Sequence, residues 1–311
     1  MKVVSYLKGI PGSNKNPEKP EVLKRFVQGV EVHGDVGIAH DGLYTPSDVA
    51  VLQGYVHEDS PHTPHLQLRK QVLDEQAKRN RRTIIVDSNL FLYLDKQNTK
   101  RYLRYSMDGV FPTTGNYFSD NPDPKRWLKV SQDLGIRTRE WRTQGNHILI
   151  CLQRNGGWSM KGLDNQDWAR DVITRIRQFS DRPIIIRGHP GDRRAGKYLN
   201  PKEKAYKLHG LDNVHISDRL NRSLQMDLNN AWCTVVYNSS PAVASAIEGI
   251  PVFVDDPIDC QAQDVCNSDI ANIEMPDVFD RELWLQKLSM CHWNFDELTS
   301  GEAWEHMRKY V

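Results

Sequence analysis

Residues 234–254 read TVVYNSSPAVASAIEGIPVFV, and this stretch decides the fold class. An apolar run is followed by a segment rich in Ala and Ser and then by a second apolar run, PVFV. The pattern predicts a strand over 234–238, a helix over 241–248 and a strand over 251–254. Continuous apolar strands joined by a helix are typical of a parallel sheet that is covered on both faces.

The same alternation extends along the rest of the chain. In the second half it predicts strands over 147–152, 183–187 and 213–217 and helices over 165–179 and 219–230. In the first half it predicts strands over 3–7, 36–40, 49–53 and 83–87 and helices over 21–30 and 65–80. We therefore expect an α/β protein with two facing Rossmann-like domains, 1–143 and 144–311. The stretches RELWLQKLSM and GEAWEHMRKYV predict terminal helices, one of which crosses back to the first domain.

The composition argues against membrane insertion and export. The 311 residues include 41 Lys and Arg against 40 Asp and Glu, and the mean hydropathy is −0.62. No apolar run approaches the roughly 20 residues that span a bilayer, and the start MKVVSYLKGIPG lacks the features of a signal peptide. We expect a cytoplasmic protein.

The cysteine and histidine spacings predict neither disulfides nor a bound metal. The five cysteines include no CxxC pair, which favours reduced thiols. A zinc site would need paired Cys or His residues at short spacing. His57, His62 and His65 are the nearest approach to such a pattern, and the prolines between them indicate a loop with solvent-facing histidines.

Basic residues concentrate in the middle of the chain. Residues 66–242 contain 31 basic and 18 acidic side chains, whereas 243–311 contain 4 basic and 14 acidic ones. A basic middle suits a phosphate-rich partner, either a nucleotide or a nucleic acid. Solvated helix faces give the same composition, so the charge alone leaves both interpretations open.

The loop RGHPGDRRAGKY (187–198) follows a predicted strand. Its cationic and imidazole groups, Arg187 and His189 among them, suit a nucleotide phosphate at the carboxyl end of that strand. The loop also spells G-x-x-x-x-G-K and ends this motif at Lys197, so a P-loop kinase is an alternative. Tyr198 stands where a P-loop needs Ser or Thr to hold magnesium, which argues against the kinase.

Two further polar loops follow strands of the second half. The loop after 147–152 can wrap a diphosphate with Arg154, Gly157 and Trp158. The loop after 234–238 places amide and hydroxyl groups at a helix start, a typical anion site, with Asn238, Ser239 and Ser240. Glu248 stands near the end of that helix, where a carboxylate is unfavourable to the helix dipole. A carboxylate at this position could accept hydrogen bonds from sugar hydroxyls, or it could simply be exposed to solvent.

Taken in order along the chain, these motifs resemble the nucleotide-sugar domain of GT-B glycosyltransferases, in particular the capsule polysaccharide transferases. The matching residues are His189, Pro190, Ser239, Ser240, Glu248, Gly249, Pro251 and Val252. In that family the Glu lies about a turn ahead of the Gly, whereas here Glu248 directly precedes Gly249.

This resemblance covers about 147–311 and implies that a nucleotide sugar binds there. A UDP-sugar is the favoured donor, a CMP-sugar is possible, and no tightly bound cofactor is expected. The activity implied is that of a hexosyl- or pentosyltransferase. UDP-sugar 2-epimerases share the fold, so a non-transferase remains an alternative.

The N-terminal half is similar to a group of phage-encoded proteins of this fold that add sugars to hydroxymethylated pyrimidines in DNA. The similar stretches are SDVAVLQGYVHEDS, TIIVDSNLF and RYLRYSMDGVFPTTGNYF. The resemblance implies an acceptor-side domain at 1–143, a 5-hydroxymethylcytosine acceptor in double-stranded bacteriophage DNA, and a location in the host cytoplasm. A capsule or lipopolysaccharide acceptor is the main alternative, and a non-catalytic nucleic-acid binder is another.

An acceptor hydroxyl needs a general base, because it is a poor nucleophile until its proton is being removed. The candidates at strand ends are Asp87, Asp41 and His57. Asp87 is the first choice because it directly ends the apolar strand 83–87, although capping a turn is an equally good explanation for it. The loop Gly9–Lys19, rich in Gly, Asn and Lys, could close over the acceptor.

A DNA acceptor would need phosphate contacts and an aromatic surface for a flipped base. The aromatic residues of the first half that could supply the surface are Tyr102 and Tyr105, and the basic residues that could supply the phosphate contacts are Arg69, Lys70, Lys78, Arg79, Arg81, Arg82, Lys100, Arg101 and Arg104. Lys and Arg are also common on solvated helix surfaces, so this pattern is compatible with a protein that never binds DNA.

Overall fold

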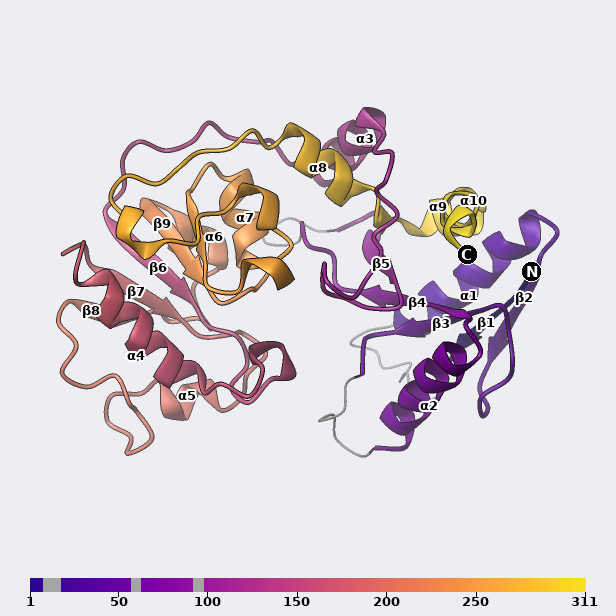
Figure 1. The fold of residues 1–311 in the computed structure, drawn as a ribbon, viewed down its shortest axis with the longest axis horizontal. Coiled ribbons are helices and arrows are strands. Elements are labelled where there is room, and N and C mark those ends of the chain that lie inside the picture. Colours follow the sequence, from indigo (N-terminus) through magenta and orange to yellow (C-terminus); the bar gives the residue numbers. More distant parts are fainter. Residues whose placement is uncertain (8–17, 57–62, 92–97) are drawn as a thin grey trace. The chain divides into compact units, whose positions relative to one another are not determined.

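The computed structural model describes residues 1–7, 18–56, 63–91 and 98–311. The chain divides into two compact units, each containing one sheet (Figure 1). The first unit contains the described residues of Met1–Asn89 and Gln97–Leu134, together with Leu285–Val311. The second contains the described residues of Leu90–Lys96 and Gly135–Trp284. The predicted α/β class with two Rossmann-like domains is confirmed.

The first unit contains a six-stranded sheet in the order β11-β5-β4-β3-β1-β2. Its strands are β1 (Lys2–Tyr6), β2 (Val36–His40), β3 (Val49–Gln53), β4 (Arg82–Asp87), β5 (Leu103–Met107) and β11 (His292–Trp293). The first four are the predicted parallel strands. β5 is antiparallel to β4, and β11 is antiparallel to β5. The prediction lacked both because LRYSM mixes polar and apolar residues and β11 is too short to show a pattern.

The inner parallel strands β1, β3 and β4 are buried on both faces, which explains their continuous apolar runs, whereas the edge strand β2 is partly exposed. In β1, Val3 and Val4 point to opposite faces and are both fully buried. Val3 packs in a core that includes Phe26 of α1 (Glu18–Val32), whereas Val4 packs with Leu68 of α2 (Pro64–Lys78). Helices therefore cover both sides of the sheet, as expected for this class.

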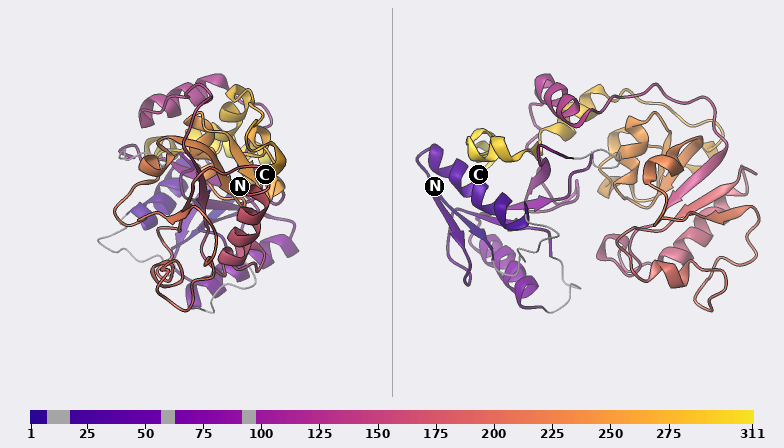
Figure 2. Two further views of the ribbon diagram at one scale, coloured as in Figure 1. Left: turned by 90° about the vertical axis from the view of Figure 1, so that its left-hand side faces the viewer. Right: turned by 180° about the vertical axis from the view of Figure 1, so that it is seen from behind.

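The C-terminal segment returns to the first unit, as predicted for a crossing helix. It contains α8 (Glu282–Ser289), β11, α9 (Phe295–Thr299) and α10 (Glu302–Met307). Figure 1 and the right-hand view of Figure 2 show α9 and α10 beside α1, and Trp304 of α10 packs edge-on against Phe26. A side chain at Gly29 would collide with the Leu298 carbonyl, so α1 and α9 approach this closely only because residue 29 is glycine.

The residue ranges of the two observed units therefore differ from the predicted domains, 1–143 and 144–311. Residues 285–311 belong to the first unit rather than the second, because β11 extends the first sheet and α9 packs on α1. The segment from Gly135 belongs to the second unit, where the Arg139 amide donates to the carbonyl of Ile247.

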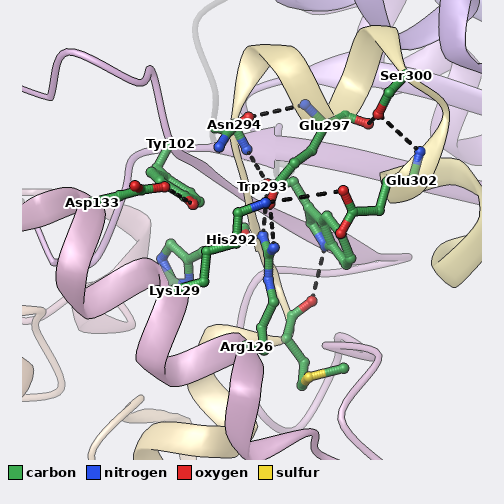
Figure 3. A network of polar contacts seen from close by, with 11 residues as sticks. Tyr102, Arg126, Lys129, Asp133, His292, Trp293, Asn294, Glu297, Ser300 and Glu302 are labelled. Atoms are coloured by element: carbon green, nitrogen blue, oxygen red, sulfur yellow. Dashed lines mark hydrogen bonds and ion pairs between the residues drawn. The ribbon is translucent and has the colours of Figure 1, made fainter.

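A buried polar network holds the returning segment against α3 (Pro124–Leu134), as Figure 3 shows. Arg126 donates to both carboxylate oxygens of Glu297 and to the His292 carbonyl, and both charged side chains are at most 6% exposed. Lys129 also pairs with Glu297. The Arg126 guanidinium lies 3.8 Å from the ring centre of Trp293, a cation–π contact. The Glu297 carboxylate also closes a capping box with Asn294 at the start of α9.

The second unit contains a five-stranded, fully parallel sheet in the order β10-β9-β6-β7-β8. Its strands are β6 (His147–Cys151), β7 (Ile184–Arg187), β8 (Val214–Ile216), β9 (Ala231–Val236) and β10 (Val252–Val254). Its helices are α4 (Asn165–Ile176), α5 (Ala195–Tyr198), α6 (Leu224–Leu228) and α7 (Pro241–Ile247). Short 3-10 turns are η1 (Trp158–Met160), η2 (Pro257–Asp259), η3 (Gln263–Val265), η4 (Ile270–Asn272) and, in the first unit, η5 (Arg308–Tyr310).

Two elements of the second unit differ from their predicted extents. The helix predicted over 219–230 is confined to α6, because Ser223 caps its start by accepting from the Met226 amide. The strand predicted over 234–238 is β9, which begins at Ala231 directly after Asn230 turns the chain with a φ of 59°. Among the described residues, no helix combines the length and apolarity needed to cross a membrane.

We predict that Glu297→Gln destabilises the protein by about 3 kcal/mol, since it leaves the Arg126 guanidinium buried without its counter-charge. Burial opposes ionisation of Glu297, but Arg126 and Lys129 hold the pKa of its carboxyl below the ordinary value. The native pair therefore contributes fully above the unfolded pKa, and this contribution is lost as pH falls through the lowered folded pKa. Urea unfolding followed by tryptophan fluorescence measures the effect at several pH values.

Glu302→Gln is the matched control, because Glu302 is 53% exposed and lies 4.0 Å from Lys129. Glu302→Gln should change the free energy of unfolding by no more than about 0.5 kcal/mol. A Glu297→Gln variant as stable as this control, or a difference that grows towards acid pH, would contradict the role assigned to the buried pair.

Candidate functional site

The strand order of the second sheet reverses at its centre. β6 lies between β7 and β9, so the chain runs from β6 through β7 to β8 on one side and later returns to β9 and β10 on the other. In open α/β sheets, ligands bind outside the carboxyl ends of the strands at such a reversal. The loops after β6, β7 and β9 are the ones that the sequence pattern selected.

The loops after β6 and β9 are joined by hydrogen bonds. The Gln153 side chain donates to the Ser159 hydroxyl at 2.7 Å, and the Asn238 amide group donates to the Ser159 carbonyl at 3.2 Å. Asn238 also donates to Asp256 at 3.0 Å, and Lys161 pairs with the same carboxylate at 2.8 Å. These hydrogen bonds join the two loops at one edge, which also includes Gln153, a residue that no sequence motif indicated.

Two polar atoms at this edge are buried without a partner among the described residues. They are the side-chain oxygen of Asn238 and the hydroxyl of Ser239. Buried polar atoms are almost always hydrogen-bonded in native proteins, so an unpaired pair at a strand end is typical of a ligand site. Ser240 is exposed beside them, while Gly157 forms a turn with the Arg154 carbonyl. The side chain of Trp158 lies outside the described residues.

The loop after β7 presents His189 in a defined tautomer. The Gly191 amide donates to Nδ1 of His189 at 3.0 Å, so a neutral ring carries its proton on Nε2 and can donate from there. Buried Asp192 fixes the loop by accepting from the Tyr198 hydroxyl and from the amides of Asn155 and Arg194. Pro190 is exposed. Asp192 was not predicted, because its role depends on contacts with the β6 loop.

Cationic groups surround His189. A Cβ atom built at Gly191 would lie 2.6 Å from Nη2 of Arg154 and 3.1 Å from Cε1 of His189, so these two side chains converge. Arg154 is exposed and has no ion pair with the described residues. Burial, together with Arg154 and Arg219, lowers the pKa of His189. The cluster of Arg154, His189 and Arg219 can therefore receive an anion, with a neutral imidazole as a hydrogen-bond donor.

Arg187, in contrast, does not reach this cluster. Its guanidinium donates to Asp227 at 2.6 Å and to the Arg222 carbonyl at 3.0 Å, and it is buried. Asp227 is 1% exposed and also accepts from Ser217. The positive charge predicted to bind a phosphate is neutralised by a carboxylate that lies 40 residues further along the chain.

Glu248 lies at the wrong end of α7 for the predicted sugar contact. α7 runs back from the carboxyl edge of the sheet, so Glu248 is displaced from Ser240 by about 12 Å along the helix axis. It is buried and pairs with Arg139 at 2.9 Å, with Gln225 as a further donor. Its carboxylate therefore holds the segment that enters the second unit.

The P-loop alternative does not fit the loop after β7. A P-loop opens a long helix at its Gly-Lys step, whereas α5 has only four residues. The backbone thus lacks the helix whose first amides would hold the phosphates.

In the first unit, Asp87 ends β4 as predicted and is 34% exposed. One oxygen accepts from Arg104 at 2.7 Å and the other accepts from the Ser88 amide at 2.7 Å. The carboxylate is therefore held in a fixed orientation at the carboxyl edge of the sheet. Asp41 is exposed after the edge strand β2, away from this pair in the strand order. His57 and most of the loop Gly9–Lys19 lie outside the described residues.

The structure does not bring the predicted DNA contacts together. Tyr102 and Tyr105 are fully buried, and Arg104 is buried against Asp87, so none of them can stack on a flipped base. The predicted arginines at the amino end of β4 pair with acidic neighbours: Arg79 with Glu75, Arg81 with Asp48, and Arg82 with Asp108. Asp87 lies at the opposite end of that strand, about 16 Å away.

Arg101 lines a pocket of about 740 Å³ in the first unit. Its other lining residues are Glu21, Arg25, Thr99, Lys100, Phe295 and Asp296. β5 runs antiparallel to β4, so the segment that precedes β5 lies at the carboxyl edge of the parallel strands, the same edge as Asp87. Charged and hydroxyl groups beside an aromatic ring give this pocket the character of a polar-ligand site.

Comparison with solved structures shows which known proteins have a similar fold. The chain matches the Thermosulfurimonas dismutans KpsC beta Kdo 2,4 transferase with a TM-score of 0.53, 13% identity, and coverage of 96% of this chain and 98% of that one. The KpsC beta Kdo 2,7 transferase from the same organism matches with a TM-score of 0.52, 12% identity and complete coverage of both chains. The chain therefore shares the GT-B fold of these transferases. No protein-family model matches it, and no curated protein matches its sequence.

We predict that His189 remains neutral, with its proton on Nε2, at pH 7, and that it titrates below the ordinary histidine value of about 6.5. Burial and Arg154 lower its pKa, because both disfavour the imidazolium. Nitrogen-detected NMR of ¹⁵N-histidine-labelled protein measures both the tautomer and the midpoint. The same histidine in the urea-unfolded protein serves as the reference. A midpoint in the folded protein above that of the unfolded protein would contradict the cationic surroundings assigned to His189.

Proposed function

We propose that this chain is a glycosyltransferase that moves a sugar from a nucleotide-sugar donor to a hydroxyl group of a saccharide acceptor. The observation that carries the proposal is the carboxyl edge of the second sheet, which combines the converging side chains of Arg154 and His189 with the polar atoms of Asn238 and Ser239 that have no partner among the described residues. The shared fold with two Kdo transferases supports the same conclusion.

The donor assignment follows from the chemistry of this edge. A nucleotide sugar carries phosphates, which suit the Arg154, His189 and Arg219 cluster, and hydroxyl groups, which can donate to the buried oxygens of Asn238 and Ser239. A neutral imidazole that donates from Nε2 can stabilise negative charge that develops on the departing phosphate. A UDP-sugar is the favoured donor, and a CMP-sugar would satisfy the same groups.

The acceptor assignment rests on the first unit. Asp87 is the proposed general base, because it is a partly exposed carboxylate held at the carboxyl edge of the sheet. The neighbouring pocket at Arg101 supplies polar and aromatic groups suited to a sugar. We favour a saccharide of the capsule or lipopolysaccharide type over 5-hydroxymethylcytosine in DNA, since the aromatic residues that would stack on a flipped base are buried.

The donor proposal predicts that calorimetric titration detects binding of a UDP-sugar or a CMP-sugar and that His189→Ala weakens it by about tenfold or more. His215→Ala is the matched control, since His215 is an exposed histidine of the same sheet and should leave the affinity unchanged. Failure of every nucleotide sugar and nucleoside diphosphate to bind the native protein would overturn the proposal.

The acceptor proposal predicts that Asp87→Asn lowers transfer by about a hundredfold or more while donor affinity stays unchanged. Transfer is measured by mass spectrometry after incubation with the bound donor and two acceptor sets, capsule-type oligosaccharides and duplex DNA with or without 5-hydroxymethylcytosine. Asp41→Asn, an exposed carboxylate after another strand of the same sheet, is the control. A mass increase confined to the hydroxymethylated base would replace the saccharide acceptor with DNA.

A further inference from the structure

The strand order of the first sheet also reverses, between β1 and β3. β1 pairs with β2 on one side and with β3 on the other, so the carboxyl ends of β1 and β3 flank the reversal. Gly54 is the first residue after β3 and has a φ of +80°, and its amide donates to the Val86 carbonyl at 2.7 Å. The position where this class of sheet binds ligands is therefore occupied by a glycine.

Arg69 fills the space that a side chain at residue 54 would take. A Cβ atom built at Gly54 would lie 3.2 Å from Nη1 of Arg69, which projects from α2. This guanidinium is half-buried, yet it has no ion-pair or hydrogen-bond partner among the described residues. Burial lowers the pKa of Arg69, and no carboxylate of the described residues opposes the shift.

This isolation distinguishes Arg69 from the other buried arginines of the same unit. Arg104 pairs with Asp87, and Arg126 pairs with Glu297. A charge that is partly withdrawn from water without compensation is unfavourable for folding. Such an arrangement at a ligand-binding position is typical of a group whose partner is the ligand.

Gly54, the residue that Arg69 approaches, lies close to the proposed base in the strand register. The β3–β4 register pairs Gln53 with Val86, so Gly54 stands opposite Asp87 on the neighbouring strand, about 4.8 Å away. Asp87 is already engaged by Arg104 on its other side. An anion held by Arg69 and a hydroxyl that faces Asp87 would therefore be near neighbours in one substrate.

We propose that Arg69 binds a negatively charged group of the acceptor, a carboxylate or a phosphate, and thereby selects an anionic saccharide. The identity of the ligand as an acceptor rests on the proposed function, whereas the anion site itself does not. Guanidinium matches both anions through paired N–H donors, which a lysine at this position could not reproduce. Gly54 leaves the guanidinium uncovered, so any larger residue there would block the same site.

The test is a titration followed through arginine Nε–H resonances in the full chain, with the Arg69 signal assigned by its loss in Arg69→Gln. The probes are methyl β-D-glucuronide, glucose 6-phosphate and, as a neutral match, methyl β-D-glucoside. We expect saturable shifts of the Arg69 signal with the anionic probes only. Comparison of the two anions shows whether the site prefers a carboxylate or a phosphate.

Arg69→Gln should weaken binding of the preferred anionic probe by about tenfold to a hundredfold. Lys70→Gln, which removes an exposed charge from the next position of α2, should leave it unchanged. Arg69→Gln should also unfold at the same urea concentration as the native protein or at a higher one, because it removes no folded-state partner. A loss of stability like that of Arg104→Gln would show a structural role and overturn the proposal.

An equal response to methyl β-D-glucoside, or no response of the Arg69 signal to either anion, would also overturn it. Failure of the proposed function is distinguishable from failure of this site. Calorimetry on the full chain measures donor binding, which is proposed for the second unit. The Arg69 signal reports on the first unit. A protein that binds no nucleotide sugar but retains the Arg69 response would keep the anion site and lose the transferase assignment.

Discussion

Parallel strand pairing is the constraint on which the rest of the structure depends. In each unit it places the carboxyl ends of neighbouring strands at one edge, so loops that are far apart in sequence converge there. Gln153 and Asn238 are separated by 85 residues, yet both lie at the carboxyl edge of the second sheet and join through Ser159. The chemistry proposed for the chain is a consequence of that convergence.

The buried pair of Arg126 and Glu297 secures the part of the fold that parallel pairing does not. β11 pairs with β5 through only two residues, and α9 is a helix of five residues. Both belong to the last part of the chain, far in sequence from the rest of the first unit. An ion pair in which Arg126 donates to both carboxylate oxygens of Glu297, stacked on Trp293, defines one orientation for this segment. The closely packed Gly29 adds a steric reason why α9 lies on α1 at one position.

The two sheets present different electrostatic surroundings at their ligand edges. In the second unit, Arg154 and a histidine of lowered pKa lie at the same sheet edge as the oxygens of Asn238 and Ser239, which have no partner among the described residues. In the first unit, Asp87 is paired with the Arg104 guanidinium, and the Arg69 guanidinium lacks a partner in the part of the chain that the structure describes. Each edge therefore combines charge and hydrogen-bonding groups, and the proposed base, Asp87, lies at the first.

The sequence by itself determined the alternation of strands and helices, the pairing of two Rossmann-like units and the position of Asp87, His189, Asn238 and Ser239 at strand ends. These features depend on apolar periodicity and turn residues, which act over a few neighbouring positions. Only the tertiary structure distinguished the exposed Arg154, which can receive an anion, from Arg187. The charge of Arg187 is neutralised by Asp227, which lies 40 residues away in the sequence. Tyr102 and Tyr105 are buried because β5 joins the sheet as an antiparallel strand. Glu248 pairs with Arg139 because α7 runs back from the carboxyl edge of the sheet. Whether a charge is free to bind a ligand depends on long-range partners, and a local pattern contains no information about them.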